Sequence, residues 1–118
     1  MKLKKAIPIL WSENVTASIS YFTNQLKFEN KWEWNDEGNF GGVYMDDVEI
    51  FFCKEDQGSP CTWLSIVVDN VDEYYDKIKD GGAKIIQPPG TKEWNMREIL
   101  VGCLDGHIIR FGHNTDCD

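Results

Sequence analysis

The sequence lacks several features that would assign a function directly. No apolar run approaches the length of a membrane span, and the run AIPILW at 6–11 is too short even for the core of a signal peptide. Histidine is scarce, with two residues, so no Ser-His-Asp or Cys-His arrangement can be assembled from the sequence. We therefore expect a cytoplasmic protein without a membrane partner and without a catalytic triad.

The four cysteines form no Cys-x-x-Cys pair, and no histidine lies near Cys53 or Cys61. This spacing does not indicate a zinc clamp. In a chain without an export signal, cysteines are expected to be reduced thiols.

Positive charge is also in short supply, with 12 Lys and Arg against 20 Asp and Glu and a formal net charge of −8. This balance argues against a nucleic-acid partner, whose phosphates would be repelled. It is compatible with a cationic ligand, although many soluble proteins are acidic without having one. A length of 118 residues is enough for one domain with its own core.

What the sequence does contain is an internal repeat of two amphipathic helices. Asn14 and Asn70 stand at equivalent positions as N-caps, Glu73 makes the second resemble a capping box, and Gly81-Gly82 is a plausible stop. The apolar positions at helical spacing are Val15, Ile19, Phe22 and Leu26 in the first segment and Val71, Tyr75 and Ile78 in the second.

Strand-like segments flank both helices in the same order. They lie at 5–11, 28–34, 40–45, 48–53, 62–68, 83–86, 96–103 and 107–111. Each half thus reads strand-helix-strand-strand-strand. We expect one α+β domain over 1–118, with module one at 1–55, a linker at 56–61, module two at 62–113 and a tail at 114–118.

Alternation within the strands separates two faces. In the last strand Ile109 and Phe111 share one face, opposite Ile108 and Arg110. The aliphatic face suits packing under the helices, whereas the mixed face suits a partly wet surface. The pattern predicts a curved mixed sheet with helices on its outer face and a concave ligand cleft.

These segments resemble the vicinal-oxygen-chelate superfamily, which includes glyoxalase I, ring-cleaving dioxygenases and bleomycin resistance proteins. The chain is most similar to the bleomycin resistance branch, and the matching pieces span nearly its whole length. They are AIPIL at 6–10, YFTNQLKF at 21–28, NFGGVYMDDVEIFF at 39–52, VDEYYDKI at 71–78 and WNMREILVGCLDGHIIRF at 94–111.

The resemblance places the four metal-ligand positions of the enzymatic members on Ile7, Phe51, Trp63 and Arg110. None of these is a usual ligand for zinc, iron or manganese, and an arginine would repel a divalent cation. We therefore expect no metal, no cofactor and no metal-dependent catalysis.

The binding branch that the chain resembles implies a homodimer with two clefts, in which the N-terminal strands are commonly exchanged. Phe40 and Trp94 match the aromatic pair that clamps the flat part of the drug in that branch. The turn EWNMRE is one residue longer than the family pattern. Without the resemblance, both rings read more readily as ordinary surface-loop or dimer-interface aromatics than as ligand contacts.

Further residues are expected to line the cleft. Trp63 and Phe51 would fill the former metal cavity, and Trp34 shares a strand face with Trp32 that either contacts ligand or packs against a partner subunit. Glu49 is the candidate that meets a positive group on the ligand. Arg110 lines the cavity or pairs with Glu49 or Glu98.

The remaining polar residues are expected to have no role in binding or catalysis. Asp36 and Glu37 read as solvated turn residues, and His107 and His113 as surface residues. Gly41-Gly42 reads as a bend where the sheet curves.

Three functions compete. The first is sequestration of a planar, cationic, bleomycin-like antibiotic without metal, which would confer resistance. The second is a glyoxalase-like enzyme with an atypical metal site built from Glu49, Glu98 and His107. The third is a cleft for an endogenous metabolite or a protein partner, because fold does not fix function.

Overall fold

The computed structural model describes residues 1–34 and 38–116. The turn residues Asp36 and Glu37, together with Cys117, therefore lie outside the described residues. No helix in the described ranges is both long and apolar enough to span a membrane.

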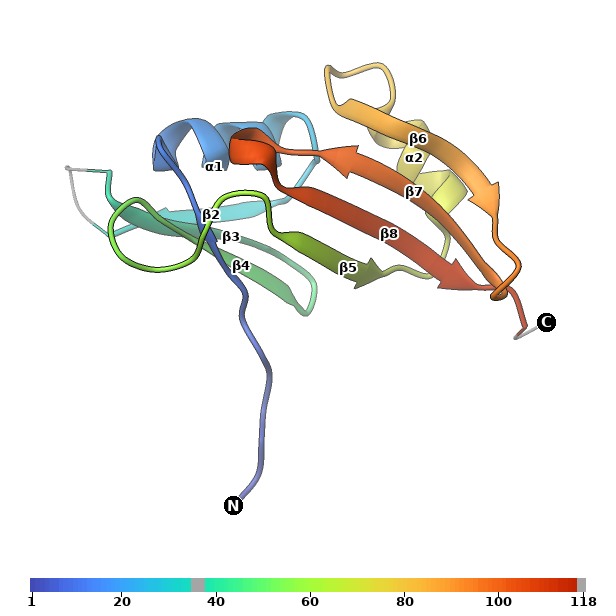
Figure 1. Ribbon diagram of the computed structural model, residues 1–118, viewed down its shortest axis with the longest axis horizontal. Coiled ribbons are helices and arrows are strands. Elements are labelled where there is room, and N and C mark those ends of the chain that lie inside the picture. Colours follow the sequence, from blue (N-terminus) through green and yellow to red (C-terminus); the bar gives the residue numbers. More distant parts are fainter. Residues whose placement is uncertain (35–37, 117–118) are drawn as a thin grey trace.

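The elements follow the predicted order, strand-helix-strand-strand-strand twice over (Figure 1). The first module consists of β1 (Ile9–Trp11), α1 (Val15–Asn24), β2 (Asn30–Glu33), β3 (Phe40–Met45) and β4 (Val48–Cys53). The second consists of β5 (Trp63–Val67), α2 (Val71–Ile78), β6 (Lys84–Thr91), β7 (Met96–Gly102) and β8 (Ile108–Asn114), with a short 3₁₀ turn at Leu104–Gly106.

The two modules have the same strand order and connectivity. The strand orders are β1-β4-β3-β2 and β5-β8-β7-β6, and in each sheet the first pair is parallel and the others antiparallel. Ile9 pairs with Phe51 in one sheet, and Ser65 pairs with Arg110 in the other. The predicted α+β class with two βαβββ modules is confirmed, with each module forming its own four-stranded sheet.

Both helices begin after the N-cap residues that the sequence predicts, Asn14 and Asn70. The side chain of Asn14 accepts a hydrogen bond from the Ala17 N–H at 3.0 Å, and that of Asn70 accepts one from the Glu73 N–H at 3.1 Å. Each bond satisfies a backbone donor that the first helical turn cannot pair internally. The second helix ends at Ile78, just before the predicted stop at Gly81-Gly82.

The first strand is shorter than predicted, since only Ile9–Trp11 of the expected segment 5–11 forms β1. Pro8 has no N–H to donate to a ladder, although its carbonyl accepts a bond from the Phe51 N–H at 3.0 Å. Residues before it leave the body of the molecule as an extended arm (Figure 1). Met1 and Leu3 are almost fully exposed there.

The hydrophobic core lies between each sheet and its helix and continues from one module to the other. Its fully buried side chains come from the aliphatic strand faces and the apolar helix stripes, as predicted. Among them are Leu10, Val15, Ile19, Phe22, Val43, Ile50, Phe52, Val71, Ile78, Ile99, Ile109 and Phe111.

Two tyrosines join the modules reciprocally. The Tyr21 hydroxyl on α1 donates to the Gly102 carbonyl at 2.6 Å and accepts from the Lys84 N–H at 3.0 Å. The Tyr74 hydroxyl on α2 donates to the Leu26 carbonyl at 2.7 Å. Burial raises the pKa of both phenols, so they remain neutral donors.

A third connection between the modules corrects the prediction that His107 lies on the surface. His107 is 3% exposed, and its Nδ1 accepts a hydrogen bond from the Thr62 N–H at 3.0 Å. The proton is therefore on Nε2, which lies 2.7 Å from the Trp11 carbonyl and donates to it. His113 is half-buried, and its Nδ1 accepts from the Val71 N–H at 2.9 Å.

An ion pair fastens α2 to its sheet. The Arg97 guanidinium makes two bonds to Asp72, at 2.7 and 2.9 Å, and the hydrogen bonds hold the pKa of Asp72 below its usual range. A lowered pKa in the folded state means that this contribution is present at neutral pH and is lost as the pH falls through the carboxyl titration.

We predict that His107→Leu lowers the free energy of unfolding by about 2–4 kcal/mol, because it leaves the part-buried Thr62 N–H and Trp11 carbonyl without these partners. His113→Leu removes one such bond and is the matched control, with an expected loss of about 1 kcal/mol. Urea denaturation followed by circular dichroism measures both. Equal losses for the two variants would contradict the role assigned to His107.

Candidate functional site

The face of each sheet that points away from its helix is called here the open face. In the first module it carries a cluster of three aromatic rings, those of Trp32, Phe40 and Phe51. The centroids are 5.4 Å apart for Trp32–Phe40, 5.1 Å for Trp32–Phe51 and 5.5 Å for Phe40–Phe51. All three pairs meet edge to face, the arrangement favoured by the ring quadrupoles. The cluster is half-buried and leaves ring surface accessible.

The cluster closes over Gly42. A Cβ on this residue would meet the Ile50 carbonyl at 2.9 Å, the Trp32 Nε1 at 2.9 Å and the Phe51 Cδ1 at 3.1 Å. Gly42, which was expected to form a bend, lies within the unbroken register of β3 and provides the space into which two of the rings pack.

The open face of the second module is polar where that of the first is aromatic. Arg110 on β8 stands at the position equivalent to Phe51, and its Nε lies 3.5 Å from the Ser65 Oγ. The same Nε lies 3.9 Å from Oε2 of Glu98. Arg110 thus approaches Glu98, one of the two partners expected for it.

Glu98 is the most deeply buried carboxylate on this face. It is 4% exposed, and its Oε2 has no hydrogen-bond partner among the described residues. Its direct cross-strand neighbours are Gly90 and Gly112, so no side chain lies directly opposite it on either adjacent strand. The sequence named Glu98 as a partner for Arg110 but gave no sign of its burial.

Several large apolar side chains on the open faces have no cover in the single chain. Trp63 is 59% exposed and Val67 73%, both on β5, and Ile9 on β1 is 36% exposed. Trp34, just after β2, is 73% exposed, and Trp94, in the turn between β6 and β7, is 56% exposed. Phe51 is half-buried within the aromatic cluster.

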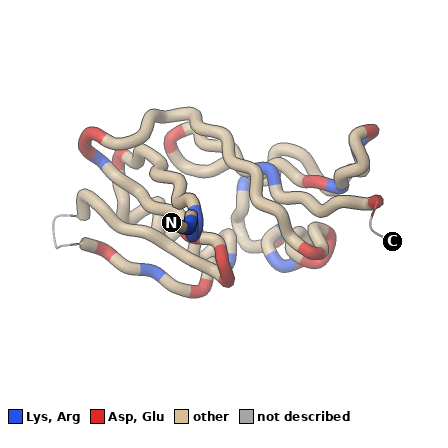
Figure 2. The backbone as a smooth tube through the Cα atoms, turned by 90° about the horizontal axis from the view of Figure 1, so that it is seen from below, with Lys and Arg blue, Asp and Glu red and all other residues tan. Residues whose placement is uncertain are grey.

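Glu49, expected to meet a positive group, does so within this chain. Its Oε1 lies 2.9 Å from the Nζ of Lys5, which is on the N-terminal arm. Figure 2 shows the basic residues of this arm gathered at the N-terminal end of the chain.

The residues of the alternative metal site are not brought together. Glu49 is paired with Lys5, Glu98 lies beside Arg110, and both ring nitrogens of His107 bond backbone groups. Across 1–34 and 38–116, no three His, Cys, Asp or Glu side chains are placed to hold a metal ion. This donor set does not fit a metal.

The thiols offer no ready nucleophile inside the fold. Burial raises the pKa of Cys103 to about 12, so its thiol stays protonated at neutral pH. Cys53, Cys61 and Cys103 are free thiols, as expected for a reduced protein.

These features can be compared with known proteins. The model of the Glyoxalase/Bleomycin resistance protein/Dioxygenase superfamily matches residues 7–111. No curated protein matches the chain in sequence.

Solved structures share the fold. A bleomycin-binding protein from bleomycin-producing Streptomyces verticillus, complexed with copper(II)-bleomycin, is 22% identical, with a TM-score of 0.78 over 94% of this chain and 96% of that one. TioX from Micromonospora sp. ML1 is 19% identical, with a TM-score of 0.82 over 94% and 98%. A glyoxalase-related enzyme from Clostridium phytofermentans is 20% identical, with a TM-score of 0.78 over 97% of each chain.

The paired βαβββ modules therefore define a protein of the vicinal-oxygen-chelate fold. The chain belongs to the Glyoxalase/Bleomycin resistance protein/Dioxygenase superfamily. The predicted resemblance is confirmed.

We predict that Gly42→Ala disturbs the aromatic cluster, because its methyl group meets a backbone carbonyl and two rings. The expected loss is about 1–3 kcal/mol in free energy of unfolding, with a change in the near-ultraviolet circular dichroism of the packed rings. Gly90→Ala is the matched control, since its Cβ would meet only the Pro88 carbonyl at 4.0 Å. An unchanged near-ultraviolet spectrum in Gly42→Ala would contradict the packing described.

Proposed function

We propose that this protein binds a planar, cationic, bleomycin-like small molecule on the open faces of a homodimer, without using a metal cofactor. The observation that carries the proposal is the contrast between the two faces. One presents the rings of Phe40 and Phe51, and the other presents Arg110 beside the buried carboxylate of Glu98.

A second copy is the natural cover for these faces. Contiguous exposed apolar surface marks interaction sites, and Trp63 and Val67 on β5 are both more than half exposed. The arm at residues 1–8 extends away from the body, which suits exchange of this segment between subunits (Figure 1).

The ligand is inferred from the chemistry of the side chains. A flat heteroaromatic group would stack between Phe40 and Trp94, which contributes about 0.5–1.5 kcal/mol per ring pair beyond area burial. Glu49 would meet a positive group of the ligand after releasing Lys5, and Arg110 would meet an acceptor. Trp34, Trp63 and Phe51 would supply apolar walls.

Sequestration by such a site would confer antibiotic resistance in a cytoplasmic protein. The open faces could equally take an endogenous planar metabolite. The enzymatic alternative has no support from the donor set, because Glu49, Glu98 and His107 are each engaged elsewhere.

We predict that metal-free bleomycin binds with a dissociation constant in the low micromolar range or tighter, measured by isothermal titration calorimetry. Phe40→Ala and Trp94→Ala should each weaken binding by about two- to tenfold, as expected for loss of one stacking contact. Tyr75→Leu, on the helix side of the second module, is the matched control and should bind as the parent does. A flat titration would rule out bleomycin and leave the endogenous metabolite as the ligand to be sought.

The homodimer is tested separately by size-exclusion chromatography with light scattering. We predict a dimer at micromolar concentration and a monomer for Val67→Asp, which places a charge in the proposed interface. Gln57→Asp adds the same charge in the exposed segment between the modules and should leave the dimer intact. A monomeric parent protein would refute the proposed assembly.

A further inference from the structure

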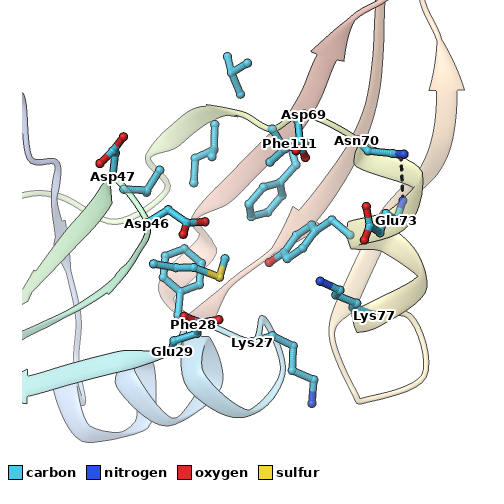
Figure 3. Close-up of a pocket in the computed structure, with 16 residues that line it drawn as sticks. Lys27, Phe28, Glu29, Asp46, Asp47, Asp69, Asn70, Glu73, Lys77 and Phe111 are labelled. Atoms are coloured by element: carbon cyan, nitrogen blue, oxygen red, sulfur yellow. Dashed lines mark hydrogen bonds between the residues drawn. The ribbon is translucent and has the colours of Figure 1, made fainter.

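A large cavity lies apart from the aromatic cluster and from the pair formed by Arg110 and Glu98. It has a volume of about 790 Å³ and opens between the two modules, on the side of the sheets that carries the helices. Its walls come from the α1–β2 connection, the β3–β4 turn, the end of β5, the start of α2 and β8 (Figure 3). Of the open-face residues described above, Val67 also lines this cavity, whereas Phe40, Phe51, Trp63, Trp94, Glu49 and Arg110 do not.

The floor of this inter-module cavity is apolar. Phe111 and Phe28 are buried at its base, and the ring of Tyr74 lies against that of Phe111, with centroids 4.6 Å apart. Met45, Val48 and Ile66 complete the floor. The Tyr74 hydroxyl is already donated to the Leu26 carbonyl, so the floor offers a ligand no free phenol proton.

The rim is acidic at two separate ends. Asp46 and Asp47 stand at the β3–β4 turn on one side, and Asp69 and Glu73 stand at the start of α2 on the other, with the apolar floor between them (Figure 3). The turn is fixed by Asp46, which adopts a left-handed conformation with φ of 53°. The two acidic ends are thus attached to different modules, and the ties between the modules set the gap between them.

These carboxylates are not held in ion pairs within the described residues, although Lys4 and Lys5 of the N-terminal arm line a second pocket together with Asp46 and Asp47. Within the described ranges, none of the four forms an ion pair. With Glu29 the rim carries five carboxylates against two lysines, Lys27 and Lys77, and neither lysine forms an ion pair with them. An anionic ligand would meet repulsion there, and a neutral apolar ligand would leave every carboxylate unused.

We propose that the inter-module cavity binds a linear aliphatic diamine or polyamine, with one ammonium group at each acidic end and the methylene chain along the apolar floor. Each methylene group removed from water on that floor adds hydrophobic stabilisation. Bridging both ends lets the second ammonium bind at the high effective concentration set by the first. This site is independent of the function proposed above, because none of the side chains proposed to contact the planar ligand lines the cavity.

The test is calorimetric titration of the full chain with spermidine and 1,5-diaminopentane at low ionic strength, with 1-aminopentane as the single-charge analogue. Both polyvalent amines should bind saturably at one site per chain, and 1-aminopentane at least about tenfold more weakly. In a series of diamines from three to eight carbons, affinity should pass through an optimum at the chain length that spans the two ends.

Two double variants address the ends separately. Asp46→Asn with Asp47→Asn, and Asp69→Asn with Glu73→Gln, should each weaken spermidine binding by about five- to tenfold, as expected for loss of partly exposed charge pairs. The matched control is Asp56→Asn with Asp80→Asn, which removes the same charge from exposed positions off the cavity rim and should leave affinity within about twofold.

Absence of saturable binding, equal affinity for 1-aminopentane, or an equal loss in the control variant would each overturn the proposal. The last two results would reduce the effect to general attraction by an acidic protein. Bleomycin titration of the rim variants separates the two sites, because these substitutions leave the open faces intact. Failure of polyamine binding with normal bleomycin binding would reject the cavity site alone.

Discussion

The fixed placement of one module against the other is the constraint on which the rest of the structure depends. It rests on hydroxyl bonds from Tyr21 and Tyr74, each of which crosses from one module's helix to the other module's backbone. Because the acceptors are backbone carbonyl groups, these hydrogen bonds depend on the path of the main chain. They depend little on the identity of the surrounding side chains. His107 adds a further bond between the modules, to the Trp11 carbonyl. A continuous core beneath these bonds makes the pair of modules one folding unit.

The repeat was visible in the sequence because it is a property of local patterns. Helical periodicity, the N-caps Asn14 and Asn70, and strand alternation all report on neighbours within a few residues along the chain. These local patterns sufficed to predict the order of the elements and which face of each strand would be buried. The short β1 shows where such patterns fail, since Pro8 has no N–H to donate to the neighbouring strand.

The features that the sequence did not predict are all products of distant segments. His107 looked like a surface residue because the groups that bond its ring come from Thr62 and Trp11. Glu98 gave no sign of burial, because that depends on Arg110 and on glycines in both neighbouring strands. The inter-module cavity draws on five separate segments, so no local motif marks it. The aromatic residues of the first open face were identified in sequence, but their mutual packing over Gly42 was not.

The two modules share one strand topology but differ in side-chain polarity at equivalent positions. Phe51 stands in one sheet where Arg110 stands in the other. Any molecule that touches both of these points therefore meets an aromatic ring at one end and a guanidinium group at the other. Such a surface favours one orientation of its ligand over the reverse orientation. A ligand with two identical ends would satisfy half of it, whereas one with a flat apolar end and a hydrogen-bonding end would be held in a single orientation. Because the two modules differ in these side chains, a symmetric scaffold can distinguish the two ends of a ligand.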